Sequence, residues 1–168
     1  MIITAEMDID GEDWRPVVSR GVTFSRYLVS NYGRILGPRG KVSVGKKVGG
    51  GYLALDLTFT VEETKTYTQF TNTIRGERRV ANLTMHGLVA ETFMPIRDNL
   101  PPEWANVRWS LTQDHFNILQ RLYMVDHING DKHDNRVANL RYVTSYQNNS
   151  VVKKVQLNEY ERNTEFGT

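Results

Sequence analysis

The sequence predicts an α+β protein in which a small N-terminal antiparallel sheet precedes a unit of two strands and a short helix. Two observations carry this prediction. In the first half of the chain, segments rich in strand-forming residues are separated by glycine-containing turns. In the second half, two apolar runs flank a polar loop, and a segment with a helix-start signal follows the second run.

The strand signals of the first half begin at Trp14. The segment 27–30 is followed by an Asn-Tyr-Gly-Arg turn at 31–34 and by a return strand from Ile35, which predicts a hairpin. After the glycines at 49–51, further strand-forming segments span 52–59, 66–73 and 79–84. We therefore expect an antiparallel sheet of about four or five strands within residues 12–84.

The period of the apolar residues changes after this region. A short helix is predicted over residues 85–93, ending before Pro95. Residues 97–121 form an irregular link in which Thr112 can cap a second helix over 113–122. The expected units are thus a sheet region at 12–84, a second domain at 85–152 that contains this link, and a tail at 153–168.

Composition excludes several protein classes. The chain has 168 residues, of which 39% are hydrophobic and 24% charged, so it can bury a core. Without cysteine it has neither disulfides nor a cysteine-based zinc site. No apolar run approaches the roughly 18 residues of a membrane span, and the acidic N-terminus is unlike a signal peptide.

Charge is unevenly distributed along the chain. The segment 14–55 contains no Asp or Glu, which favours binding of a polyanion such as DNA, although a solvated basic face without a partner explains it equally well. The basic residues of this segment are Arg15, Arg20, Arg26, Arg34, Arg39, Lys41, Lys46 and Lys47. We expect Arg34 to be the best DNA contact among the arginines, because a tight turn would project it.

The chemistry of the chain is concentrated between Asp126 and Asn149. Asp126 and His127 follow the apolar run 122–125, and the Asn-Gly-Asp turn after them allows both side chains to reach one site. Asn139 precedes the second apolar run, where it can tie the loop down through backbone hydrogen bonds. Thr144 and Gln147 match a capping box, so a helix is expected from Ser145, with Asn148 facing back towards the strands.

These residue types suit phosphodiester hydrolysis. A carboxylate and an amide oxygen, here Asp126 and Asn148, can hold a hard divalent cation that keeps several waters. A neutral imidazole, here His127, can activate water near physiological pH.

The pattern resembles the HNH endonucleases, and most closely the phage homing type, whose active site is a ββα-metal finger. The matching residues are Val125–His127, Asn129–Asp131, Asn135, Asn139–Thr144 and Asn148. The resemblance implies that Asp126 and Asn148 bind the metal, Mg²⁺ or Mn²⁺ or another divalent ion. It implies that His127 is the general base and that Asn139 orients the loop. Upstream, residues 85–93 resemble the helix before such fingers, and residues 14 and 27–35 resemble a nuclease-associated DNA-binding module.

The resemblance implies an enzyme that hydrolyses double-stranded DNA to 5′-phosphate and 3′-hydroxyl ends, acting in the cytoplasm of a bacterial host and encoded by a phage. One finger cuts one strand, so a monomer would nick, and a double-strand break would need a homodimer. The alternatives are a DNA-binding accessory protein without cleavage and a restriction or defence nuclease. Gly87 departs from the usual Arg of the preceding helix, and the link 97–121 is longer than is typical.

Several other residues are expected to have simpler roles. His133 is interpreted as a solvated loop residue, with a position near a phosphate as the alternative. Asp131 and Asp134 are interpreted as turn residues of the loop, with metal ligation as the alternative. His86 is expected to be structural, although it could also support the site or contact a phosphate. Arg141 is expected to be a strand residue that faces solvent.

Overall fold

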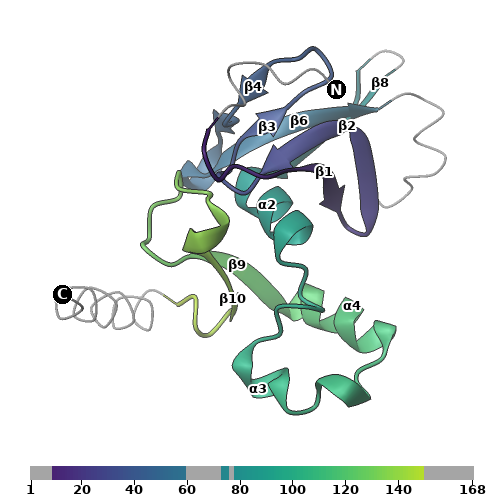
Figure 1. Ribbon diagram of the computed structural model, residues 1–168, viewed down its shortest axis with the longest axis vertical. Coiled ribbons are helices and arrows are strands. Elements are labelled where there is room, and N and C mark those ends of the chain that lie inside the picture. Colours follow the sequence, from purple (N-terminus) through teal and green to yellow (C-terminus); the bar gives the residue numbers. More distant parts are fainter. Residues whose placement is uncertain (1–8, 60–72, 76–77, 150–168) are drawn as a thin grey trace.

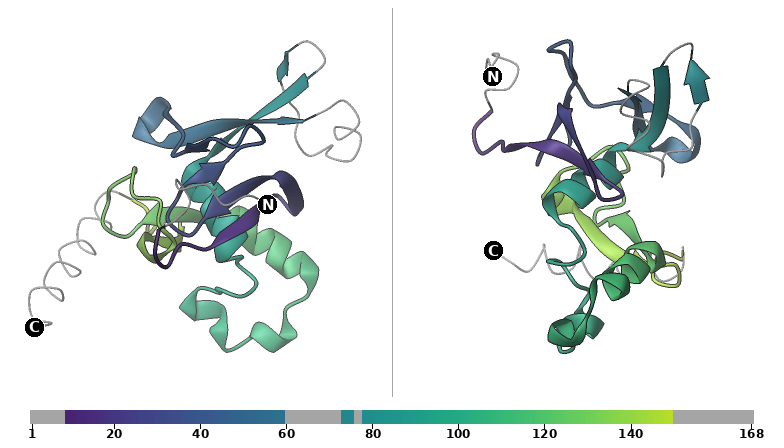
Figure 2. Two further views of the ribbon diagram at one scale, coloured as in Figure 1. Left: turned by 45° about the horizontal axis from the view of Figure 1, so that its top comes forward. Right: turned by 90° about the vertical axis from the view of Figure 1, so that its right-hand side faces the viewer.

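In the computed structural model, the described residues are 9–59, 73–75 and 78–149. They form two antiparallel sheets, a set of short helices and a two-stranded hairpin, which confirms the α+β class. The two sheets lie at one end of the molecule and the link with its helices at the other, with the central helix and the hairpin between them (Figures 1 and 2). Most of the strand expected at 66–73 and all of the tail at 153–168 lie outside the described residues. No helix among the described residues is long and apolar enough to span a membrane.

The first sheet has four strands in the order β1-β2-β3-β4. The predicted turn at 31–34 connects the second strand to the third, and Gly33 adopts a φ of 74° there. The strands are β1 (Trp14–Ser19), β2 (Val22–Ser30), β3 (Ile35–Leu36) and β4 (Val42–Ser43).

A second sheet has four strands in the order β5-β6-β8-β7, so the expectation of one small sheet was wrong. The chain leaves the first sheet at Gly45, whose φ is 87° and whose absent Cβ would lie 2.8 Å from the carbonyl oxygen of Ala54. Only glycine allows this close approach. The elements are β5 (Lys46–Lys47), the 3₁₀ turn η2 (Gly49–Gly51), β6 (Leu53–Phe59), β7 (Thr73–Arg75) and β8 (Arg78–Thr84).

The helix α2 (Met85–Phe93) follows β8 directly, and it confirms the helix predicted over these residues. Its apolar face, which includes Leu88 and Val89, is fully buried against residues of both sheets, such as Val17 and Leu57. Leu140 of the hairpin belongs to the same core. The sheets and the hairpin are therefore held by one helix through shared apolar contacts.

The link has a small core of its own, formed by Ile96, Phe116, Leu119 and Tyr123. The helix predicted over 113–122 is confirmed, and Thr112, predicted to cap its start, forms a capping box with His115. The remaining elements are α3 (Pro102–Ala105), η3 (Arg108–Ser110), α4 (Gln113–Leu122), β9 (Tyr123–His127), η4 (Val137–Asn139) and β10 (Leu140–Thr144).

Candidate active site

The β9–β10 hairpin fixes the positions of the Asp-His pair. The two strands are antiparallel, with His127 opposite Leu140 and Asp126 opposite Arg141. β9 ends at His127, and the N–H of Gly130 donates to the His127 carbonyl at 3.0 Å to close the turn. Asp126 and His127 are both buried, at 3% and 2% exposed. The strand β9 therefore ends where the sequence predicts. The side chains of Asp126 and His127 have different neighbours.

Asn139 holds the loop between the strands. Its Oδ1 accepts a hydrogen bond from the N–H of Asn129 at 3.0 Å. Its Nδ2 donates to the side chain of Asn129 at 2.9 Å and to the carbonyl of Asp134 at 2.8 Å. Three bonds from one buried amide connect both ends of the loop, as a loop anchor requires.

His127 is held by Asn135, a residue for which no role was predicted from the sequence. Its Nε2 lies 3.0 Å from Oδ1 of Asn135, which is buried as well. The Nδ2 of Asn135 donates to the carbonyl of His133 at 3.2 Å. The only sequence signal for Asn135 was its place in the family pattern.

Gly33 connects the first sheet to this loop. A Cβ at Gly33 would lie 2.8 Å from the carbonyl carbon and oxygen of Asn135. Beside this contact, the N–H of Val137 donates to the carbonyl of Asn31 at 2.9 Å. The turn between β2 and β3 is therefore seated directly on the residue that holds His127.

An aromatic cluster surrounds the other side of His127. The ring of His86, from the start of α2, packs edge-on against it with centroids 5.2 Å apart. Tyr52 lies 5.0 Å from His86 and 6.2 Å from His127, and Lys132 Nζ lies 4.5 Å above the Tyr52 ring. His86, expected to be structural, thus lies next to the candidate base.

The pKa of His86 is lowered to about 4, mainly by burial and also by the neighbouring His127, while Asp126 opposes the change. His86 is therefore neutral at physiological pH. Its Nε2 lies 3.3 Å from Oγ1 of Thr84, and its buried Nδ1 has no hydrogen-bond partner among the described residues.

Asp126 is paired with Arg141, so the expectation that Arg141 faces solvent was wrong. Nη2 and Nε of Arg141 lie 3.1 and 3.3 Å from the same carboxylate oxygen, Oδ2 of Asp126. The cause is the strand register, which places the two residues directly opposite each other on one face of the hairpin.

Asn148 lies in the turn at 145–148, directly after β10. The expected capping box is present: the N–H of Thr144 donates to Gln147 Oε1 at 2.8 Å, and the N–H of Gln147 donates to Thr144 Oγ1 at 3.2 Å. The N–H of Asn148 donates to the Thr144 carbonyl at 3.0 Å, which forms one helical turn. Continuation of the helix beyond Asn149 falls outside the described residues.

The donor types of Asp126 and Asn148, a carboxylate and an amide oxygen, fit a hard divalent cation such as Mg²⁺ or Mn²⁺. Among the described residues there is no cluster of three or more His, Cys, Asp or Glu that could hold a metal ion. Asp131 and Asp134 instead serve the loop, because Asp131 accepts from the N–H of His133 and Asp134 pairs with Arg136.

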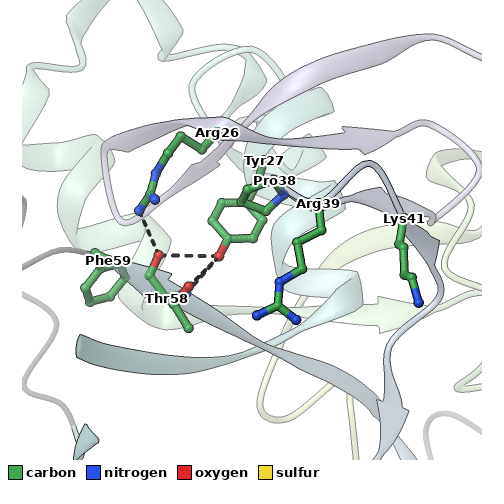
Figure 3. Close-up of a pocket in the computed structure, with 8 residues that line it drawn as sticks. Arg26, Tyr27, Pro38, Arg39, Lys41, Thr58 and Phe59 are labelled. Atoms are coloured by element: carbon green, nitrogen blue, oxygen red, sulfur yellow. Dashed lines mark hydrogen bonds between the residues drawn. The ribbon is translucent and has the colours of Figure 1, made fainter. Parts of the chain in front are cut away.

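Five of the six predicted DNA contacts fall into two groups. Arg26, Arg39 and Lys41 line a surface pocket of 540 Å³ between β2, the β3–β4 turn and β6, which Tyr27 and Phe59 also line (Figure 3). Arg26 donates to the carbonyl of Thr58 at 3.0 Å. Lys46 forms an exposed ion pair with Asp56 at 3.1 Å, and Lys47 next to it is exposed.

Arg34 is not projected into solvent, so that expectation was wrong. Its guanidinium forms an ion pair with Glu12, whose side chain is fully buried, and lies over the ring of Trp14. Only 18% of the Arg34 side chain is exposed. Glu12 precedes the acid-free segment, which is why the charge pattern gave no sign of this pair.

Comparison with known proteins places this site. Residues 122–150 match the family model described as HNH endonuclease. The uncharacterized HNH endonuclease L247 of Acanthamoeba polyphaga mimivirus is 28% identical over 145 residues, which cover 86% of this chain and 27% of that protein. The chain thus spans about a quarter of the length of this relative.

The fold is similar to a solved structure described as DNA binding and cleavage by the HNH homing endonuclease I-HmuI. The TM-score is 0.51 at 19% identity, over 92% of this chain and 67% of that one. Residues 122–150 thus match the HNH endonuclease family model, and they are set in an α+β fold similar to that of an HNH homing endonuclease.

Proposed function

We propose that this protein is a divalent-metal-dependent DNA endonuclease of the homing type that nicks double-stranded DNA. The observation that carries the proposal is the buried Asp126–His127 pair at the end of β9, with its imidazole and its loop held by Asn135 and Asn139. I-HmuI, whose fold is similar, is described as binding and cleaving DNA.

The hydrogen bonds of Asn135 support an assignment of the nitrogen of His127 that would act as the base. The Nδ2 of Asn135 donates to the carbonyl of His133, and this bond turns Oδ1 towards His127. Oδ1 can only accept, so Nε2 of a neutral His127 carries the hydrogen and Nδ1 carries the lone pair. We infer that Nδ1 takes the proton from the water that attacks phosphorus.

The neutral state of His86 supports this role. When His127 gains a proton it becomes a cation, and a second charged imidazole at 5.2 Å would oppose that step. The lowered pKa of His86, about 4, keeps this neighbour uncharged at the pH where His127 acts.

Asp126 and Asn148 would hold the metal ion. When bound, the ion supplies stabilisation of charge on the phosphate and on the leaving 3′ oxygen. The products are then a 5′-phosphate and a 3′-hydroxyl. The basic residues of the sheets, Arg26, Arg39, Lys41, Lys46 and Lys47, would hold the duplex through its phosphates. One finger per chain cuts one strand, so a monomer nicks and a homodimer is needed for a double-strand break.

The test is conversion of supercoiled plasmid to open circles by the wild type and by Asp126→Ala, with Mg²⁺, with Mn²⁺ and with a chelator. We expect nicking by the wild type that requires the divalent ion and the Asp126 carboxylate. No conversion with any divalent metal would favour a DNA-binding accessory protein instead. Cuts at short, frequent sites in intron-less DNA would favour a restriction or defence nuclease.

A further inference from the structure

We propose that Arg141 is a further catalytic residue of this site, with two alternating partners. Without a metal ion it neutralises Asp126. When a divalent cation takes that carboxylate, Arg141 turns to a non-bridging oxygen of the DNA phosphate at the site. The inference rests on the proposed function, because it assigns a role to this residue in the same reaction.

The contact between the two residues is set by the backbone. Arg141 and Asp126 are directly opposite in the β9–β10 register, so their side chains leave the hairpin on the same face. Two contacts of the guanidinium, at 3.1 and 3.3 Å, are to the same oxygen, Oδ2 of Asp126. The two strands thus hold the arginine within reach of Asp126 whatever else is bound.

Charge explains why this arrangement responds to a metal ion. Asp126 is only 3% exposed, and a buried carboxylate without a countercharge is strongly unfavourable. Arg141 provides that countercharge. A divalent cation held by Asp126 would compete for the same carboxylate and would repel the guanidinium, so the arginine would have to yield to the metal.

The exposed side of Arg141 indicates where the guanidinium goes. Its side chain is 31% exposed, in contrast to Asp126, so the guanidinium can turn outward without any change of the backbone. In the proposed reaction, water activated by His127 attacks a phosphate whose charge is neutralised at Asp126. That phosphate would lie beside Asp126 and Arg141. The planar fork of arginine matches two oxygens of a phosphate.

Arg136 shows how a loop arginine of the same finger differs. It makes two contacts of 2.7 Å to Asp134 and is 61% exposed. The side chain of Asp134 serves the loop, and among the described residues neither member of this pair makes a side-chain hydrogen bond to Asp126 or His127. Replacing Arg136 removes a comparable Arg–Asp pair while leaving Asp126 as it is. It therefore serves as the matched control.

The experiment measures Mn²⁺ affinity by calorimetry without DNA and nicking at saturating Mn²⁺ with DNA. In Arg141→Gln we expect Mn²⁺ to bind about tenfold more tightly, because its competitor is gone. We expect nicking at saturating Mn²⁺ to fall by roughly a hundredfold, because a charge that stabilises the transition state is lost. Arg136→Gln should leave the Mn²⁺ affinity unchanged.

These opposite directions separate the proposal from a structural role, which would weaken metal binding and nicking together. Weaker or unchanged Mn²⁺ binding in folded Arg141→Gln, or nicking at the wild-type rate, overturns it. If that variant does not fold, NMR of the wild type provides the test. The Nε–H resonance of Arg141 should shift when Mg²⁺ saturates the protein. No shift would overturn the proposed exchange of partners. A wild type that binds Mn²⁺ but never nicks refutes the proposed function, whereas the affinity change still tests the competition at Asp126.

Discussion

The bond between Asn135 and His127 allows a sharp test of how the base is prepared. Asn135→Leu keeps a side chain of similar size but removes the only acceptor that the described residues offer to the buried Nε2–H of His127. A buried donor without a partner costs about 1–3 kcal/mol in the free energy of unfolding. For a chain of 168 residues, this lowers Tm by roughly 2–12 °C.

The same change should slow catalysis. A positioned general base raises the reaction rate by a factor of about 10²–10⁴. Asn135→Leu retains the imidazole of His127, but the ring loses the hydrogen bond that fixes its orientation and keeps its hydrogen on Nε2. We therefore expect the single-turnover nicking rate to fall by about tenfold to a hundredfold. Asn135→Asp keeps an acceptor at the same place and should retain the Nε2–H tautomer.

Three measurements check this prediction: thermal unfolding, single-turnover nicking at saturating metal, and ¹⁵N NMR of the imidazole nitrogens. In the wild type we expect one tautomer with hydrogen on Nε2, and in Asn135→Leu a mixture. Asn117→Ala, in the exposed amide pair with Gln113 on α4, is the control and should change none of them. Wild-type nicking together with an unchanged Nε2–H signal in Asn135→Leu would show that Asn135 does not position His127.

Three further predictions concern the surroundings of the site. Gly33→Ala should destabilise the fold and slow nicking, because its Cβ would lie 2.8 Å from the carbonyl of Asn135. The control Gly21→Ala has a similar φ of 76° and open space around it, so it should be destabilised only by the backbone strain of about 1–2 kcal/mol. Equal free energies of unfolding for the two variants would contradict this. The pKa of His86 is lowered from 6.5 to about 4, so the folded state resists its protonation and stability falls as the pH drops. From pH 7 to pH 5 the wild type should lose about 2 kcal/mol that His86→Phe does not lose, and equal losses in urea unfolding would count against it. The buried Tyr142 hydroxyl has no hydrogen-bond partner among the described residues, so Tyr142→Phe should raise the unfolding energy by up to about 1 kcal/mol, and a decrease would oppose that explanation.

Local chemistry made much of this molecule predictable from its sequence. The helices at 85–93 and 113–122, the turn after His127 and the capping box at Thr144 each depend on residues close together in the chain. The same is true of Asn139, whose partners lie within ten residues along the chain. Such features follow from hydrogen bonds that a short segment can satisfy alone.

Features that depend on distant pairing could not be predicted. Strand register makes Arg141 a partner of Asp126, and Glu12 reaches Arg34 across 22 positions of the sequence. The division into two sheets depends on how closely Gly45 approaches Ala54. The sequence pattern marked Asn135 but could not show that it bonds to His127, because only the folded loop brings the two side chains together.

The central claim is that His127 is the base of a nuclease site. It is tested most directly by single-turnover nicking of a DNA duplex by the wild type, His127→Ala and His133→Ala at saturating metal. His133 is an exposed histidine of the same loop, and it holds Asn135 through its backbone carbonyl alone. We expect the rate to fall by a factor of about 10²–10⁴ in His127→Ala and to stay at the wild-type value in His133→Ala. A wild-type nicking rate in His127→Ala would contradict it.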